Sequence, residues 1–242
     1  MKQRITETVN LHDTDPDGIA RPSAVLRLLA DAANEQMRVH GMPPDTLLRD
    51  TGRAFLLGSV HVELLSPLHA YEQIDAEAWA CESRGFRFLR CGQLLREGVC
   101  VAQMSAVWAF VQAADRTLLP VCAFDNPFGT EAPLSLDFPL RDRTPKDLNY
   151  TCVGTYEVRY RDVDLHRHVN NTNYPDLLYG FLPNVQGQRL RAMTVFFQKE
   201  APLGERLSVY HAECDGVHYL KTVRADGTDN VHAALRLCAL ER

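Results

Sequence analysis

The sequence predicts an α+β fold in which one plan, a helix followed by an antiparallel sheet, occurs twice along 242 residues. The first observation is a turn motif, Asp13-Thr14-Asp15, which returns 149 residues later (162 − 13) as Asp162-Val163-Asp164. The second is that a helical apolar pattern and then strand-like segments follow each motif. A helix on one face of a curled sheet buries both apolar surfaces, so the repeat favours two such layers.

The first copy begins with a strand at residues 5–12 and a polar turn at residues 13–18. Ser23 suits the N-cap of a long amphipathic helix, and Gly41 suits its C-terminal cap. Between Ala54 and Val111, apolar and polar residues alternate in several segments. This alternation is typical of antiparallel strands.

The second copy follows the same order with a shorter helix. Tyr156 to Tyr160 is predicted as a strand, and Asp162 to His168 as a polar turn. Thr172 is expected to cap a helix that ends before Pro183. The inward face of the last strand is expected to carry Val231, Ala233, Leu235, Leu237 and Ala239.

The segment between the copies is rich in proline and charged residues, which is typical of a linker crossing a surface. The expected domains are therefore residues 1–122, a linker at residues 123–149, and residues 150–242.

Composition limits the function. The net charge of −5 argues against a general nucleic-acid partner, because phosphate-binding proteins usually carry a basic surplus. The chain shows neither a signal-peptide pattern nor an apolar run of the ~20 residues that cross a bilayer. A cytoplasmic location without membrane attachment is expected. The seven scattered cysteines lack a C-x-x-C pair, so we expect reduced thiols.

The two copies differ in their reactive groups. The second has Asp164, His166 and His168 at the helix entrance and Glu200 further along. With an offset of 135 residues (200 − 65), Glu200 aligns with Leu65 of the first copy. The two imidazoles and the glutamate stand where the first copy has an acid and two aliphatic residues. We infer that the C-terminal half holds the reactive groups.

Thioester hydrolysis fits these groups. A histidine and a glutamate can activate water or attack a carbonyl carbon. Asn170 and Asn171 come just before the predicted helix, whose free N–H groups favour negative charge. Backbone N–H groups of Val169, Asn170 and Asn171 are therefore expected to polarise the thioester oxygen.

Each residue also has a plainer interpretation. The Asp-x-Asp motifs suit turn and cap chemistry, and Asn170-Asn171 suits a helix cap. His166 and His168 could be a surface pair, or metal ligands with Asp164 or Glu200 as the third. No familiar metal-site spacing is present, so acid–base chemistry ranks above a metal site, and neither metal nor cofactor is expected.

The stretch from Asp162 to Tyr174, Asp-x-Asp-x-x-x-His-Val-Asn-Asn-x-x-Tyr, resembles the signature of the acyl-[acyl-carrier-protein] thioesterases of plants and bacteria. The N-terminal half, with its long helix, its turn at Pro67 and its strand at Val107-Trp108, is similar to the first domain of that family. The resemblance implies a tandem double hotdog, each unit a long helix wrapped by a curved antiparallel sheet. It also implies hydrolysis of acyl carrier protein thioesters to free fatty acids, which ends fatty acid synthesis.

The same resemblance implies the site residues. The family aspartate matches Asp164, its histidine matches His168, and its acidic residue matches Glu200. The family asparagine, two positions before the histidine, is His166 here. Some plant members have a cysteine after the glutamate, and Ala201 excludes a cysteine nucleophile at that place.

These matches suggest a mechanism. Glu200, assisted by His168, activates water or attacks the carbonyl carbon. His166 and the backbone N–H groups polarise the carbonyl oxygen, and Asp164 orients the histidines. The acyl chain is expected in an apolar tunnel of the N-terminal hotdog, residues 1–122.

Carrier protein is acidic, so a basic docking patch is expected. The candidates are Arg84, Arg87 and Arg90, and also Arg189 and Arg191, although solvated strand edges explain them equally well. A double hotdog is self-sufficient, so a monomer or a homodimer is expected.

Three other functions stay open at this stage. One is another hotdog enzyme, an acyl-CoA thioesterase or a dehydratase. The second is a non-catalytic acyl-binding protein, because His166 replaces the family asparagine. The third is a metal-dependent hydrolase that uses His166 and His168.

Overall fold

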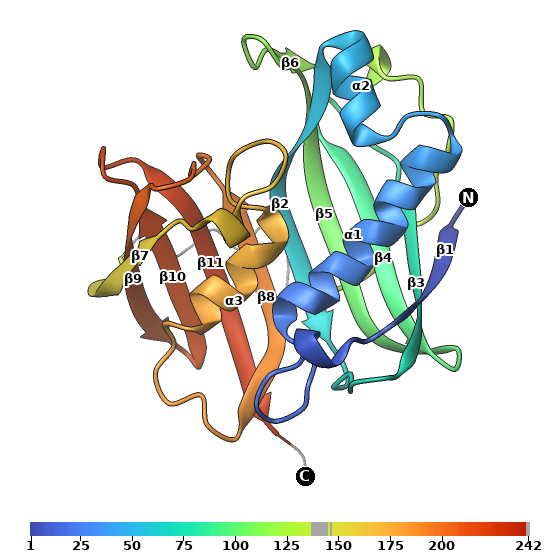
Figure 1. The fold of residues 1–242 in the computed structure, drawn as a ribbon. Helices are drawn as coiled ribbons and strands as arrows, with labels where there is room; N and C mark the ends of the chain where they lie inside the picture. The colour runs from blue at the N-terminus through green and yellow to red at the C-terminus, as the bar shows by residue number, and fades with distance from the viewer. Residues whose placement is uncertain (137–144, 146, 241–242) are drawn as a thin grey trace. The chain divides into compact units, whose positions relative to one another are not determined.

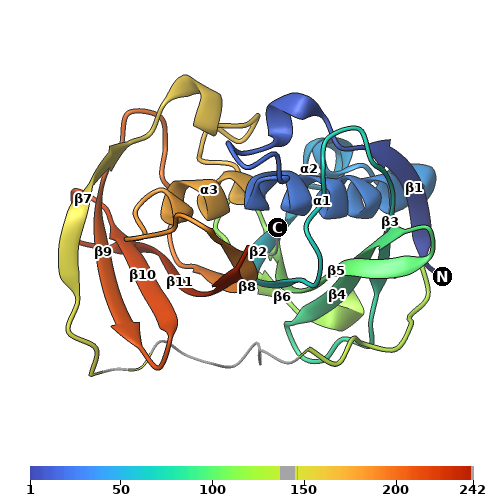
Figure 2. The ribbon, with the colours of Figure 1, turned by 90° about the horizontal axis from the view of Figure 1, so that it is seen from below.

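The computed structural model describes residues 1–136, residue 145 and residues 147–240. The chain divides into two compact units, Met1–Asp137 and Phe138–Arg242. Each unit is one antiparallel sheet with a helix on one face (Figures 1 and 2). The predicted α+β class and the repeat of one plan are confirmed. The division lies within the segment that the sequence marks as a linker.

The sheet of the first unit has the strand order β1-β3-β4-β5-β2. All of its pairings are antiparallel, and a short strand, β6, pairs with the end of β5. The strands are β1 (Gln3–Thr8), β2 (Arg53–Leu64), β3 (Gln73–Ala80), β4 (Phe88–Arg96), β5 (Val99–Gln112) and β6 (Leu118–Leu119).

Helix α1 (Pro22–Val39) covers one face of this sheet. Its N-cap is Arg21 rather than the expected Ser23, since Pro22 already suits the first helical turn. It ends where expected, because Gly41 adopts a φ of +76°, which favours glycine. A Cβ at Gly92 of β4 would lie only 3.1 Å from Leu29 Cδ2, so the missing side chain lets α1 approach the sheet.

Two features of this unit were not expected from the sequence. A second helix, α2 (Pro44–Thr51), follows α1 and ends at Gly52 with a φ of +66°. Residues of the expected linker pack on the first unit: Phe128 is buried, and Phe124 lies 5.0 Å from Phe55 between ring centroids. The aromatic cluster also contains Phe88 and Phe110.

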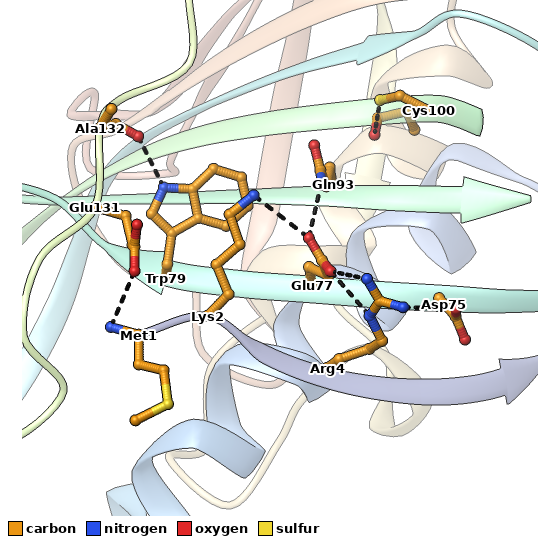
Figure 3. Close-up of polar contacts among 11 residues, drawn as sticks. Met1, Lys2, Arg4, Asp75, Glu77, Trp79, Gln93, Cys100, Glu131 and Ala132 are labelled. Atoms are coloured by element: carbon orange, nitrogen blue, oxygen red, sulfur yellow. Dashed lines mark hydrogen bonds and ion pairs between the residues drawn. The ribbon is translucent and has the colours of Figure 1, made fainter. Parts of the chain in front are cut away.

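Side-chain contacts hold the edge strand β1 to β3 (Figure 3). Arg4 of β1 donates through Nε to Glu77 of β3 at 2.9 Å, and Gln93 of β4 donates to the same carboxylate at 2.7 Å. Lys2 Nζ lies over the Trp79 ring, 4.2 Å from its centroid. Trp79 Nε1 donates to the Ala132 carbonyl at 3.0 Å, so the sheet is tied to the segment that follows it.

The sheet of the second unit has the order β8-β11-β10-β9-β7, again antiparallel. The strands are β7 (Thr151–Glu157), β8 (Gln188–Phe197), β9 (Arg206–Cys214), β10 (Val217–Val223) and β11 (Asp229–Ala239). Three of the expected inward residues of β11 are among the most buried in the unit: Val231, Ala233 and Leu235.

The helix of the second unit is short, although the resemblance implied a long helix in each unit. After a 3-10 turn at Asn171–Asn173, α3 spans only Tyr174–Tyr179. The strand predicted at residues 156–160 was also misplaced, because β7 ends at Glu157 and a 3-10 turn occupies Tyr160–Asp162.

At the helix entrance, the same backbone hydrogen bonds occur in both units, so residues of the first unit can be matched to residues of the second. Asp15 N–H donates to Ile19 O at 2.8 Å, and Asp164 N–H donates to His168 O at 3.2 Å. The same 149-residue offset relates the turns that follow, so the repeated motif forms the same loop twice.

The later offset was predicted wrongly. Ala20 N–H donates to Leu68 O at 2.8 Å, and Val169 N–H donates to Ala201 O at 2.9 Å. The offset at these acceptors is 133 (201 − 68), not 135. Glu200 therefore corresponds to Pro67 of the first unit rather than to Leu65.

Candidate active site

Asp164 organises the loop that carries the two histidines. Its Oδ1 accepts the His166 N–H at 2.8 Å, and its Oδ2 accepts Asn170 Nδ2 at 3.1 Å. One half-buried carboxylate thus joins both ends of the loop. This arrangement is turn and cap chemistry, and it also places Asp164 where it orients the histidine segment.

His168 and Glu200 come together although 32 residues separate them (200 − 168). His168 Nε2 lies 3.6 Å from Glu200 Oε1, and the side chains are 20% and 34% exposed. This distance is too long for a direct hydrogen bond. It is short enough for an ion pair, or for a water molecule that bridges the two side chains. The other ring nitrogen, Nδ1, lies 3.2 Å from Val169 O, and we therefore assign the proton of the neutral ring to Nδ1.

His166 stacks on His168, with ring centroids 5.8 Å apart and an interplanar angle of 16°. Their spacing of two residues in an irregular stretch does bring the rings to one side, as expected. Within the described parts of the chain, no group of three or more His, Cys, Asp or Glu side chains is arranged to hold a metal ion.

Two of the expected oxyanion donors are already used within the loop. Val169 N–H donates to Ala201 O at 2.9 Å, and Asn170 N–H donates to Asp162 O at 2.8 Å. In this conformation neither N–H is available to a substrate oxygen, because each stabilises the loop geometry. Asn170 is a cap residue, since its Oδ1 accepts from the Thr172 N–H at 2.9 Å.

Asn171 is the remaining candidate of this group. It begins the 3-10 turn that leads into α3 and is half-buried. Its N–H lies at the open end of that turn, where backbone donors lack intrahelical partners.

Sequence reasoning missed Asn230, which is fully buried at the start of β11. Its Nδ2 donates to Tyr174 Oη at 2.9 Å. Burial, above all, raises the pKa of Tyr174 to about 12, so the phenol is neutral. The one signal in the sequence was an asparagine at the head of an apolar strand, where asparagine is disfavoured.

The expected docking patch at Arg84, Arg87 and Arg90 is only partly on the surface. Arg90 donates to Gln36 Oε1, and its burial lowers the pKa of the guanidinium to about 10. Arg90 is thus a structural residue of the first unit. Arg84 and Arg87 are exposed, and Arg84 lies 3.4 Å from Glu82.

The site lies in a recognisable domain. Residues 146–236 match the acyl-ACP thioesterase C-terminal domain, and this range contains Asp164, His168 and Glu200. This match identifies the C-terminal part of the chain as an acyl-ACP thioesterase C-terminal domain. The protein is a thioester hydrolase.

Solved structures support the fold over the whole chain. An acyl-ACP thioesterase from Bacteroides thetaiotaomicron superposes with a TM-score of 0.80 at 17% identity, covering 98% of each chain. An oleoyl thioesterase from Lactobacillus plantarum gives 0.80 at 16% identity, covering 100% of this chain and 98% of that one. The 12:0-ACP thioesterase from Umbellularia californica gives 0.76 at 15% identity, covering 98% and 97%.

These likenesses confirm the tandem double hotdog that the signature implied. No curated protein matches this chain. Among its described residues, no helix is both long and apolar enough to cross a membrane.

Proposed function

We propose that this thioesterase hydrolyses fatty acyl thioesters of acyl carrier protein, and that His168 and Glu200 carry the chemistry. The single observation behind the proposal is the approach of His168 Nε2 to Glu200 Oε1, 3.6 Å, inside the thioesterase domain. A base and a carboxylate at this separation can hold one water molecule between them.

In the proposed reaction, a water molecule donates one O–H to His168 Nε2 and the other to Glu200. His168 removes a proton as the water oxygen bonds to the thioester carbonyl carbon. His166 and the Asn171 N–H stabilise the developing oxyanion. The C–S bond then breaks, and the proton moves from His168 to the leaving sulfur. The products are a free acid and the carrier thiol.

The first unit supports the assignment of the chemistry to the second. By the matched backbone hydrogen bonds, His168 corresponds to Ile19 and Glu200 to Pro67. The loop is the same, but an aliphatic side chain and a proline cannot transfer protons. The loop can therefore form without an imidazole and a carboxylate, so their presence in the second unit is not required by the loop geometry.

The surface around the site supports a protein-borne substrate. Tyr160, Leu165 and Leu203 are 86%, 70% and 55% exposed. The loops that carry these residues are joined by backbone contacts. Val158 N–H donates to Glu205 O at 2.9 Å, and His168 forms an isolated antiparallel β-bridge with Pro202. Exposed apolar side chains grouped beside a site favour contact with a protein partner.

Charge favours an acidic partner at this surface. Arg161 and Arg167 are exposed on the same loops. Guanidinium groups beside apolar contacts suit a partner of negative charge, as a carrier protein is expected to be. This patch replaces the one that included Arg90.

Glu200→Gln and His168→Asn test the proposal, because each removes a proton-accepting group while keeping the side-chain volume similar. Turnover of a carrier-protein thioester should fall by about a hundredfold or more in each variant. The matched control is Asp17→Asn, at the position of His166 in the first unit, and it should keep wild-type turnover. Near wild-type kcat in both site variants would show that His168 and Glu200 do not carry the chemistry.

The remaining expectations stay predictions. These are a cytoplasmic location, a role in ending fatty acid synthesis, the acyl tunnel in residues 1–122, and a monomeric or homodimeric state. The choice between carrier protein and coenzyme A as the thiol carrier is also a prediction until it is measured.

A further inference from the structure

Asn230 is bonded to three separate parts of the second unit through its side chain alone. Nδ2 donates to Tyr174 Oη at 2.9 Å and to the Lys199 carbonyl, and Oδ1 accepts the Thr222 hydroxyl at 2.7 Å. The side chain is fully buried, so these contacts are not exchanged for water. Asn230 thereby connects the start of α3, strand β10 and the segment before Glu200.

The backbone of Asn230 holds the same segment. Its carbonyl accepts the N–H of Gln198 at 2.9 Å and the N–H of Lys199 at 3.2 Å. Lys199 directly precedes Glu200, and it is therefore fixed through both its N–H and its carbonyl. Tyr174, the other partner, comes three residues after Asn171 on the segment that begins at His168.

The first unit builds this junction without a polar side chain. There the Val101 carbonyl accepts the N–H of Leu65 at 2.8 Å and the N–H of Ser66 at 3.1 Å. The pattern of two successive donors to one carbonyl is the same, but the residue is a buried valine. The fold therefore does not need an asparagine at this place.

A buried asparagine and a buried phenol are stabilising only when they are hydrogen-bonded, since an unpaired polar group is costly. When all members are bonded, such a network rigidifies the segments it joins. The network occurs in the unit whose two joined segments carry His168 and Glu200. The network therefore lies where it can fix the two site residues relative to each other.

We propose that Asn230 is a positioning residue for thioester hydrolysis. It fixes the segment before Glu200 against Tyr174, so that the Glu200 carboxylate stays beside His168 Nε2. This inference rests on the proposed function, because it assumes that the two groups act together.

The test is a double-mutant cycle between Asn230→Val and Glu200→Gln. Valine copies the residue of the first unit. In the wild-type background, Asn230→Val should lower kcat on a carrier-protein thioester about tenfold or more, with KM within a factor of about three. In the Glu200→Gln background, it should lower kcat no further. A purely structural role would lower activity by the same factor in both backgrounds, which would overturn the inference.

A second variant covers the case in which Asn230→Val fails to fold. The triple change Asn230→Val, Tyr174→Phe and Thr222→Val removes every side-chain group that the single change leaves unpaired. It should regain the melting temperature lost by the single variant but not the lost kcat. Recovery of kcat together with stability would contradict a positioning role.

The outcomes separate the two proposals. If Glu200→Gln abolishes turnover while Asn230→Val leaves kcat unchanged, only the positioning role of Asn230 is wrong. If Glu200→Gln itself leaves turnover unchanged, the proposed catalytic function is wrong as well.

Discussion

At the residue scale, Arg167 is held in an unfavourable backbone conformation between the two histidines. Its φ is +65°, and the matching residue of the first unit is Gly18 with a φ of +75°. A non-glycine residue in the left-handed region costs roughly 1–2 kcal/mol. Such residues cluster at functional sites, and Arg167 lies on the surface proposed for the carrier protein.

Arg167→Gly should therefore stabilise the protein by up to about 1 kcal/mol, because relief of the strain exceeds the extra unfolded-state entropy of glycine. Denaturant unfolding of both proteins measures the difference. The reciprocal control is Gly18→Arg in the first unit, where a Cβ would meet nothing within 4 Å. That change should destabilise by a similar amount. A loss of stability in Arg167→Gly would show that the arginine makes contacts worth more than its strain.

The sequence predicted part of the site and missed the rest for a physical reason. Local spacing was enough to bring His166 beside His168 and to make Asp164 a loop residue. The N–H groups of Val169 and Asn170 were assigned wrongly because their acceptors depend on how the loop closes. Asn230 was missed because its partner Tyr174 is 56 residues away in the chain, beyond any local pattern.

At the scale of elements, the reliable predictions were those with long periodic patterns. Helix α1 and the alternating strands between Ala54 and Val111 were found. The eight-residue helix α2 and the end of β7 were not, because short elements are decided by tertiary contacts. At the end of β7, Val158 N–H donates to Glu205 O, which redirects the chain.

Strand β1 gives an acid-dependence prediction, because Glu77 anchors it. Burial would raise the pKa of Glu77, but hydrogen bonds from Arg4 and Gln93 and the charge of Lys2 outweigh it and lower that pKa below 4.5. A carboxyl with a depressed folded-state pKa contributes stability above its unfolded pKa and loses it as pH falls through the folded value.

Glu77→Gln should therefore be less stable than wild type near neutral pH, with a difference that shrinks as pH falls below 4.5. Thermal unfolding across this pH range measures it. Glu82→Gln is the control, since the Glu82 side chain is 76% exposed and its loss should change stability little at any pH. A constant difference between Glu77→Gln and wild type would mean that the contribution of Glu77 is not electrostatic.

At the scale of the whole molecule, the chain repeats one fold but not one site. Both units have the same loop closed by the same backbone hydrogen bonds, with Asp15 and Asp164 in the same role. The repeat was visible in the sequence because turn residues are fixed by local geometry. The later offset was misjudged, since strand register depends on pairing that no local motif records.

The measurement that tests the central claim most directly is release of free fatty acid from carrier-protein and coenzyme A thioesters of the same acyl chain. Wild-type protein and Glu200→Gln would be compared over a panel of chain lengths. We predict a higher kcat/KM on carrier-protein thioesters for wild type, and loss of hydrolysis in Glu200→Gln. Faster turnover of the coenzyme A thioesters, or hydrolysis that survives in Glu200→Gln, would contradict it.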